Sequence, residues 1–288
     1  MRLTIKIACA LAAIAILGIW LSTRHSGTSD VVCDTLTLTG EIKPKLFFDA
    51  QDCLVRSKAK EKTFVITESS GGDWEAALAM GILIHRHGWN VEVVDLCASS
   101  CANFIFPAGK KKYLHADAML LYHGGPHQKN MPEKYRAAEQ AYMAHHASAT
   151  SSSSATNSTS AADAAASPLH DPRARIEGSI TFDDQGTLRL KVREFLGVRD
   201  VSGADDLFAK LVAASDRFYE ELGVNLLLPH YGQIGQYEPK YEAGELGGFI
   251  YRLDSLARLG VGNIDVKGGE WHPERHRDYT DVYEVTYP

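Results

Sequence analysis

Residues 63–109 read TFVITESSGGDWEAALAMGILIHRHGWNVEVVDLCASSCANFIFPAG, and this segment carries most of the information about the fold. It begins with a short run of β-branched residues, which predicts a buried strand. Asp73 then caps a helix with an apolar side, and Gly88 ends it. Residues 89–96 predict the next strand. A strand, a helix and a strand at this spacing indicate parallel strands joined by right-handed crossovers.

The same pattern continues on both sides of this segment. Residues 35–42, TLTLTGEI, alternate apolar and polar side chains, as in a half-buried strand, and Pro44 begins a helix with one apolar stripe. Residues 102–106 predict a short buried helix, and residues 118–122, AMLLY, a fourth strand. Further on, residues 204–222 have the periodicity of an amphipathic helix. The sequence therefore predicts an α/β fold built on a parallel sheet.

The composition permits a globular protein with a sizeable core. Of the 288 residues, 45% are hydrophobic and 23% are charged, which is too apolar for a disordered chain. The net charge of −6 lacks the basic excess that binding to nucleic acid requires, so nucleic acid is not an expected partner. The three lysines at 110–112 read as a solvated turn, and His272 and His276 as surface residues of a charged tail without a metal.

The N-terminus has the pattern of an export signal. Arg2 and Lys6 precede an uncharged apolar run at 7–21, which is shorter than the roughly 20 residues of a bilayer span. No clean A-x-A cleavage site follows the run. Residues 1–24 are therefore either a cleaved signal peptide or a retained membrane anchor. In both cases we expect the rest of the chain outside the cytoplasm.

The cysteines agree with an oxidising compartment. Cys9 lies in the export segment, which leaves an even set of four. Of the three possible connectivities we favour Cys33 with Cys53 and Cys97 with Cys101, because each pair brackets one local turn of the chain. Buried thiols are the alternative. A zinc site is less favoured, because the C-x₃-C spacing has no second ligand pair nearby.

Polar side chains follow three of the predicted strands. A glycine pair, Gly71 and Gly72, comes after the second strand, and Ser99 and Ser100 stand between the third strand and the short helix. His123 follows the fourth strand. The carboxyl ends of parallel strands meet at one sheet edge, where ligands bind. The sequence therefore predicts a site at this edge.

The order TESSGG, helix, strand, CASSCANFIFPAG and LLYHGG resembles the ClpP/crotonase superfamily, most closely its exported bacterial members with a C-x-S-x-C motif. The resemblance covers about residues 35–125, and residues 254–264 are similar to the closing helix and strand of the family. It implies a spiral of ββα units behind an N-terminal signal or anchor helix, in the periplasm or anchored in the inner membrane and facing the periplasm. The domain would then comprise residues 31–128 and 176–267, with a mobile Ala/Ser/Thr-rich insertion at 129–175 and a C-terminal tail at 268–288.

Carried over residue by residue, the resemblance implies a serine-type active site. Gly71 and Gly72 would form the oxyanion-hole turn, and His123 would be the general base. The C-x-S-x-C frame selects Ser99 as the nucleophile, whereas counting nine residues back from the glycine of PAG selects Ser100. Both serines stay candidates, with Ser100 preferred. The second oxyanion donor would be the amide of the residue after the nucleophile, which is Cys101 in the preferred case.

The sequence departs from the peptidase pattern at the third member of a catalytic triad. The family's peptidases carry an Asp twelve residues before the glycine that Gly260 matches, and Gly248 stands there. Glu245 and Asp254 are nearby, but Asp254 reads as a helix cap. A Ser–His dyad is the alternative to a triad.

Two functions therefore stay open. The first is an exported serine hydrolase or peptidase that acts on an extended polypeptide. The second is a catalytically inactive module that kept the fold for binding or scaffolding. The resemblance also implies a homo-oligomer, and neither function requires a cofactor.

Overall fold

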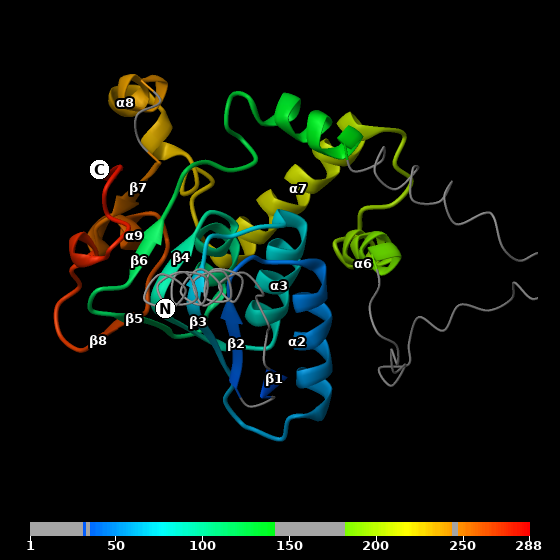
Figure 1. Cartoon of the computed structure of the whole chain (residues 1–288), viewed down its shortest axis with the longest axis horizontal. Helices are drawn as coiled ribbons and strands as arrows, with labels where there is room; N and C mark the ends of the chain where they lie inside the picture. Colours follow the sequence, from blue (N-terminus) through cyan, green and yellow to red (C-terminus); the bar gives the residue numbers. More distant parts are fainter. Residues whose placement is uncertain (1–30, 33–34, 142–181, 244–246) are drawn as a thin grey trace, which may run out of the picture.

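The computed structural model describes residues 31–32, 35–141, 182–243 and 247–288 (Figure 1). The predicted apolar segment at 7–21 and most of the Ala/Ser/Thr-rich insertion lie outside these residues. The strands are β1 (Val31–Val32), β2 (Thr35–Thr39), β3 (Thr63–Ser69), β4 (Asn90–Ala98), β5 (Lys112–His115), β6 (Met119–Leu121), β7 (Gly248–Tyr251), β8 (Ile264–Lys267) and β9 (Val282–Val285). The α-helices are α2 (Pro44–Arg56), α3 (Trp74–Arg86), α4 (Phe106–Ala108), a helix at 131–141, α6 (Phe182–Phe195), α7 (Ala204–Leu222), α8 (Glu238–Glu242) and α9 (Leu253–Arg258). Short helical turns are the π-helix η1 (Cys101–Ile105) and the 3₁₀ turns η2 (Tyr231–Gln233), η3 (Gly235–Tyr237) and η4 (Pro273–Arg275).

The centre of the fold is a mostly parallel sheet. Its strand order is β1-β2-β3-β4-β5-β8, and β6 pairs with the end of β4 beyond β5. Among the strands of this sheet that the structure describes, only β1 runs antiparallel to its neighbour. Strands β7 and β9 form a separate parallel pair, which an antiparallel bridge between Tyr122 and Phe249 connects to the end of β6. The predicted α/β fold with a parallel sheet is confirmed.

The predicted helix signals are present in the structure. The Asp73 carboxylate accepts a hydrogen bond from the amide of Ala76 at 2.9 Å and caps α3. That helix ends at Arg86, two residues before Gly88, which has a φ of +63°. The predicted amphipathic helix at 204–222 is α7, with the same bounds.

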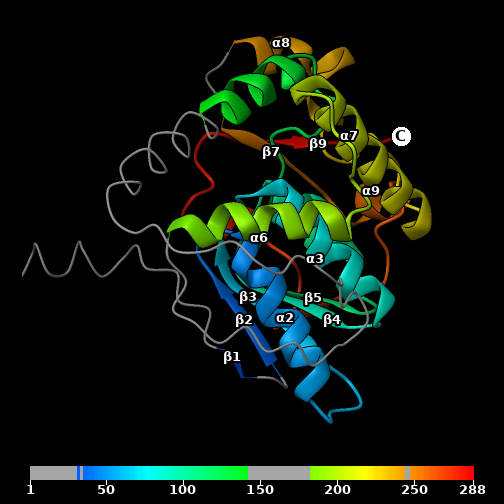
Figure 2. The ribbon, with the colours of Figure 1, turned by 90° about the vertical axis from the view of Figure 1, so that its right-hand side faces the viewer.

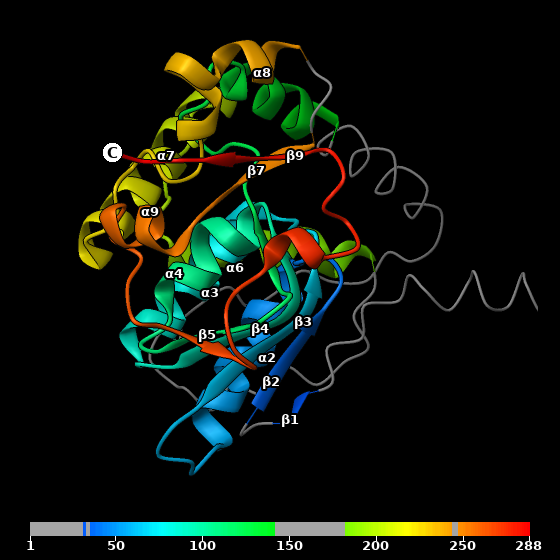
Figure 3. The same ribbon diagram turned by 90° about the vertical axis from the view of Figure 1, so that its left-hand side faces the viewer.

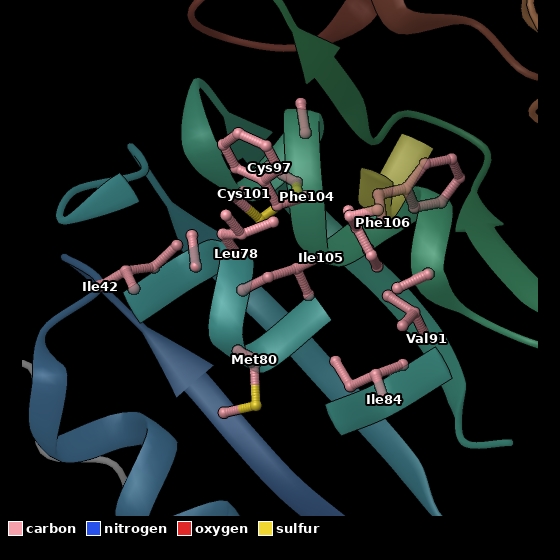
Figure 4. Packing of buried hydrophobic residues seen from close by; sticks show 14 of the residues in the cluster. Ile42, Leu78, Met80, Ile84, Val91, Cys97, Cys101, Phe104, Ile105 and Phe106 are labelled. Carbon is pink, nitrogen blue, oxygen red and sulfur yellow. A yellow bond between two sulfur atoms is a disulfide. The ribbon is translucent and has the colours of Figure 1, made fainter. Parts of the chain in front are cut away.

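One large apolar core lies on a single face of the sheet. Helices α2 and α3 and the short helix after β4 pack there, and α6 crosses over α2 and α3 (Figure 2). Figure 4 shows Leu78 and Ile84 of α3 beside Ile105 of η1 and Val91 of β4. Almost all of α3 is buried, because the sheet contacts one side of it and α6 and α7 contact others. This packing holds the loop between β3 and α3 in place.

The C-terminal segment covers part of the opposite face (Figure 3). The indole nitrogen of Trp271 donates to the carbonyl of Ala118 at 2.6 Å. His276 is only 6% exposed, and its ring contacts the carboxylate of Asp95 at 2.8 Å. The prediction that His276 is a surface residue is therefore wrong, because the tail returns to β4.

Two further predictions need correction. The lysines at 110–112 are not all solvated, since Lys112 begins β5 and is 6% exposed, with its ammonium group donating to the carbonyl of Gly109 at 2.8 Å. Burial lowers the pKa of Lys112 to about 8. The sequence does not predict strand β5, because its four residues, KYLH, are too few to show an alternation of apolar and polar side chains. The N-cap of α9 is Arg252 rather than Asp254.

A buried ion-pair network joins α6 to α3. Glu75, 1% exposed, accepts hydrogen bonds from Arg193 at 2.6 and 2.9 Å and from the hydroxyl of Tyr135 at 3.0 Å. Arg193 also contacts the carboxylate of Glu139 at 3.0 Å. The carboxylate of Glu75 therefore accepts hydrogen bonds both from α6 and from the helix at 131–141.

We predict that Glu75→Gln lowers the free energy of unfolding by about 3 kcal/mol, because Arg193 keeps its charge in a buried place and loses its main counterion. Chemical denaturation measures the change. The control is Asp52→Asn, which breaks the exposed i,i+4 pair with Arg56 and should cost less than about 0.5 kcal/mol. Equal effects of the two variants would contradict the structural role of the buried network.

Candidate active site

The carboxyl ends of three strands bring the predicted site residues to one edge of the sheet. Ala98 pairs with Leu121 in parallel register, and the amide of Ser99 donates to the carbonyl of Leu121 at 2.9 Å. Ser99 thus lies beside the chain that leads to His123. A Cβ atom built on Gly71 would lie 2.7 Å from the Cβ of Ser99, so the Gly-Gly turn touches the same segment.

The CASSC segment makes a sharp turn from β4 into a helix. Ser99 has a φ of 57°, in the left-handed region that residues with a side chain rarely adopt. Cys97 and Cys101 form the predicted disulfide across this turn, with a Cα–Cα distance of 5.4 Å, and both are fully buried. The other predicted pair stays a prediction, because Cys33 lies outside the described residues, while Cys53 is buried in α2.

The two candidate serines differ in their surroundings. Ser100 is 3% exposed, and its hydroxyl donates to the carbonyl of Gly72 at 3.2 Å. Ser99 is half-buried, and its hydroxyl has no hydrogen-bond partner among the described residues. Ser100 stands directly before the helical residues 101–108, so its hydroxyl lies at a helix N-terminus.

The two glycines of the predicted oxyanion turn are not equivalent. The amide of Gly71 donates to the hydroxyl of Ser69 at 3.2 Å, and its carbonyl accepts from the amide of Ile42 at 2.7 Å. Within the described part of the chain, the amide of Gly72 has no acceptor. The amide of Cys101 belongs to the first helical turn, whose N–H groups have no intrahelical carbonyl. Gly72 and Cys101 therefore each offer an open donor within the described part of the chain.

His123 follows β6 and is exposed at this edge of the sheet. Its carbonyl accepts a hydrogen bond from the side-chain amide of Gln233 at 2.6 Å, which holds the backbone. Neighbouring protein atoms partly desolvate the ring and lower its pKa, and the charge of Lys134 acts in the same direction. The imidazole is thus neutral near pH 7, as a general base must be. Among the described residues, no hydrogen bond joins this ring to Ser99 or Ser100.

The structure explains why no carboxylate stands at position 248. Gly248 begins β7, and a Cβ atom there would lie 2.6 Å from the carbonyl oxygen of Tyr122. There is no space for a side chain so close to the strand that leads to His123. Glu245 lies outside the described residues, and Asp254 pairs with Arg258 at 3.3 Å. In the described ranges, no carboxylate hydrogen-bonds to the ring of His123.

A histidine–aspartate pair that the sequence analysis did not select lies in the loop after His123. The ring of His127 contacts the carboxylate of Asp216 on α7 at 2.6 Å, and its centroid is 6.1 Å from that of His230. Nearby, the side-chain amide of Asn103 donates to the carbonyl of Gly124 at 2.9 Å. These contacts fix the loop to α7 and to the short helix. His127 and Asp216 are 89 residues apart, so no local pattern marks the pair.

A scan against protein-family models and a search of curated proteins found no match to this chain. No group of three or more His, Cys, Asp or Glu side chains with the arrangement of a metal site occurs in the described ranges. None of the helices in that part of the chain combines the length and the apolar character of a membrane span.

We predict that the stability of the fold decreases as the pH falls from 6.5 towards 4. His230 is 8% exposed, and burial, followed by the nearby His127, lowers its pKa to about 4. Below pH 6.5 the unfolded chain therefore binds a proton at this position that the folded chain does not bind. The loss reaches about 3 kcal/mol for this group.

Denaturation at several pH values measures this loss, and His230→Asn should flatten the pH dependence over the same interval. An unchanged slope in the variant would contradict the assignment to His230.

Proposed function

We propose that the chain is an exported serine hydrolase with a ClpP-like spiral fold and a Ser100–His123 dyad. The observation that carries the proposal is the contact between the Ser100 hydroxyl and Gly72, at 3.2 Å, at the start of a helix. In this contact the hydroxyl donates to the carbonyl of Gly72, and it therefore lies beside the residue whose own amide has no acceptor among the described residues. Nucleophilic catalysis at a carbonyl carbon uses such a pairing of a hydroxyl with an open N–H donor.

The reaction would use these groups in turn. The Ser100 oxygen attacks the carbonyl carbon of the substrate while its proton passes to the imidazole of His123. The carbonyl oxygen becomes an oxyanion and accepts hydrogen bonds from the amides of Gly72 and Cys101. His123 then protonates the leaving group. In the second step His123 takes a proton from water, the water oxygen attacks the acyl carbon, and the proton returns from His123 to the Ser100 oxygen as the acyl group leaves. The Ser100 hydroxyl must first turn from Gly72 towards His123, since catalytic hydrogen bonds are often incomplete without substrate.

The sharp turn and the disulfide support Ser100 rather than Ser99 as the nucleophile. Ser99 adopts the left-handed backbone conformation, and Ser100 then stands at the start of the helix. The oxyanion donor after Ser100 is the amide of Cys101, which the disulfide holds in place. By resemblance, the substrate is an extended polypeptide and the active form a homo-oligomer, located in the periplasm or anchored in the inner membrane.

A second candidate function is a binding or scaffolding module without catalysis. It is favoured by Gly248, because the position that carries the triad aspartate in related peptidases has no space for a carboxylate. Without such a group the tautomer and orientation of His123 are not held, and activity falls by orders of magnitude.

We predict that a fluorophosphonate probe labels the purified chain on Ser100. Ser100→Ala should abolish labelling, and His123→Gln should slow it at least about 100-fold, because the base is lost. The matched control is Ser99→Gly, which accepts the φ of 57° and should keep most of the labelling. In-gel fluorescence gives the rates, and circular dichroism checks that each variant is folded.

Each alternative outcome has a distinct meaning. Loss of labelling in Ser99→Gly but not in Ser100→Ala would move the nucleophile to Ser99. No labelling of the folded parent chain would overturn the hydrolase and leave the binding module.

We further predict that the Cys97→Ala/Cys101→Ala double variant still folds but reacts more slowly. Opening this five-residue loop costs about 2 kcal/mol by the chain-entropy relation. The labelling rate should fall at least about tenfold, because the turn no longer holds the Ser100 hydroxyl beside Gly72. Thermal denaturation and the labelling rate test the two effects separately. An unchanged rate would show that the disulfide does not position the nucleophile.

A further inference from the structure

The loops at the amino ends of the parallel strands carry a concentration of positive charge. These loops are the α2–β3, α3–β4 and α4–β5 connections, at the edge of the sheet opposite the candidate active site (Figure 1). We call the cations that they share with the ends of α2 and α3 the amino-edge surface. It consists of Arg56, Lys58, Lys60, Lys62, Arg86, Lys110 and Lys111, all exposed except the half-buried Lys62.

Contacts between the three loops make this surface continuous. The carbonyl of Lys62 accepts a hydrogen bond from Asn90 at 2.8 Å, and the ammonium group of Lys62 lies 5.7 Å from the ring centroid of Trp89. The amide of Lys110 donates to the carbonyl of Trp89 at 2.7 Å. A Cβ atom on Gly88 would lie 3.8 Å from the side chain of Lys110. Cations that are far apart in sequence therefore form one patch.

The positive charge of the patch is largely uncompensated. Of its seven cations, only Arg56 has an ion pair with a described residue, the exposed Asp52. Glu61 is the acidic residue within the α2–β3 loop, and no ion pair with it is present among described residues. Lys62 and Arg86, after burial, lower the pKa of His87, which is the effect of a positive local potential. The net charge of the whole chain is −6, so the charge of this edge is opposite in sign to that of the rest of the protein.

We infer that the amino-edge surface docks the domain on anionic lipid headgroups. Five of the seven cations are lysines, whose mobile point charges suit a fluid layer of phosphates better than a fixed bidentate partner. Among the described residues of the three loops no Phe, Tyr or Trp ring is exposed for stacking on nucleobases, since Trp89 is 2% exposed. At its rim Val55 is 56% exposed, an apolar side chain that fits the boundary of a lipid layer.

The first strand of the sheet also reaches this edge. Val32 of β1 pairs with Thr35, and Thr35 pairs with Thr63, the residue after Lys62. Val32 and Thr35 therefore lie beside the amino-edge surface, and β1, which runs antiparallel to β2, approaches this edge from the carboxyl side of the sheet. Docking through this edge leaves the carboxyl edge, with Ser100 and His123, facing away from the lipid. The inference does not depend on the hydrolase proposal.

The test compares binding of the exported chain to phosphatidylcholine vesicles with and without phosphatidylglycerol, by cosedimentation at low and high salt. If the chain retains its apolar segment, both vesicles bind it, and the measured quantity is the excess due to phosphatidylglycerol. The test variant reverses four charges of the patch, Lys58→Glu, Lys60→Glu, Lys110→Glu and Lys111→Glu. The control makes the same net change at exposed cations elsewhere, Lys129→Glu, Lys191→Glu, Arg217→Glu and Lys240→Glu.

We expect phosphatidylglycerol to strengthen binding of the parent and of the control, and high salt to remove the gain. In the patch variant, the increase in affinity that phosphatidylglycerol causes should be at least about 100-fold smaller than in the parent. No gain from phosphatidylglycerol, or equal losses in both variants, would overturn the inference. Binding of single-stranded DNA at least as tight as that of the anionic vesicles would also overturn it, by replacing lipid with a nucleic acid partner.

Discussion

The candidate site depends on one constraint, the reversal of the backbone between β4 and the helix that follows it. Ser99 takes a left-handed conformation that costs energy for a residue with a side chain. A buried disulfide between Cys97 and Cys101 closes the turn. Gly71 has no Cβ atom, and this leaves room for the side chain of Ser99. With these conditions met, Ser100 begins the helix with its hydroxyl beside Gly72. A relaxed turn would separate the Ser100 hydroxyl from Gly72.

The fold was predictable where local signals agree with tertiary packing. The caps of α3, the apolar stripe of α2 and the periodicity of α7 are local features, and all three helices form as the sequence predicts. Strand β5 was missed because it is short and begins with a lysine whose burial depends on its neighbours. The burial of His276 likewise results from a contact with Asp95, 181 residues away, which no local pattern encodes.

The candidate site was predictable to the level of the sheet edge. Ser99, Gly71 and His123 follow parallel strands that are neighbours in the sheet. Gly71 lies against Ser99, and the Ser99 amide donates to Leu121, two residues before His123. Which glycine amide is open was not predictable, because it depends on the hydroxyl of Ser69. The pair of His127 and Asp216 joins two elements far apart in the chain and had no signal in the sequence. The sequence has a glycine instead of a carboxylate at position 248, and the carbonyl of Tyr122, which a Cβ atom there would meet, gives the steric reason.

The two edges of the sheet have different roles in these proposals, with chemistry at the carboxyl ends and lipid contact at the amino ends. The most direct test of the active-site geometry is a crystal structure of the protein after reaction with a small fluorophosphonate. Phosphorus bonded to the Ser100 oxygen, with a phosphoryl oxygen within hydrogen-bond distance of the Gly72 and Cys101 amides, is the expected result. An unmodified Ser100, or a phosphoryl oxygen pointing away from both amides, would contradict the proposed oxyanion hole.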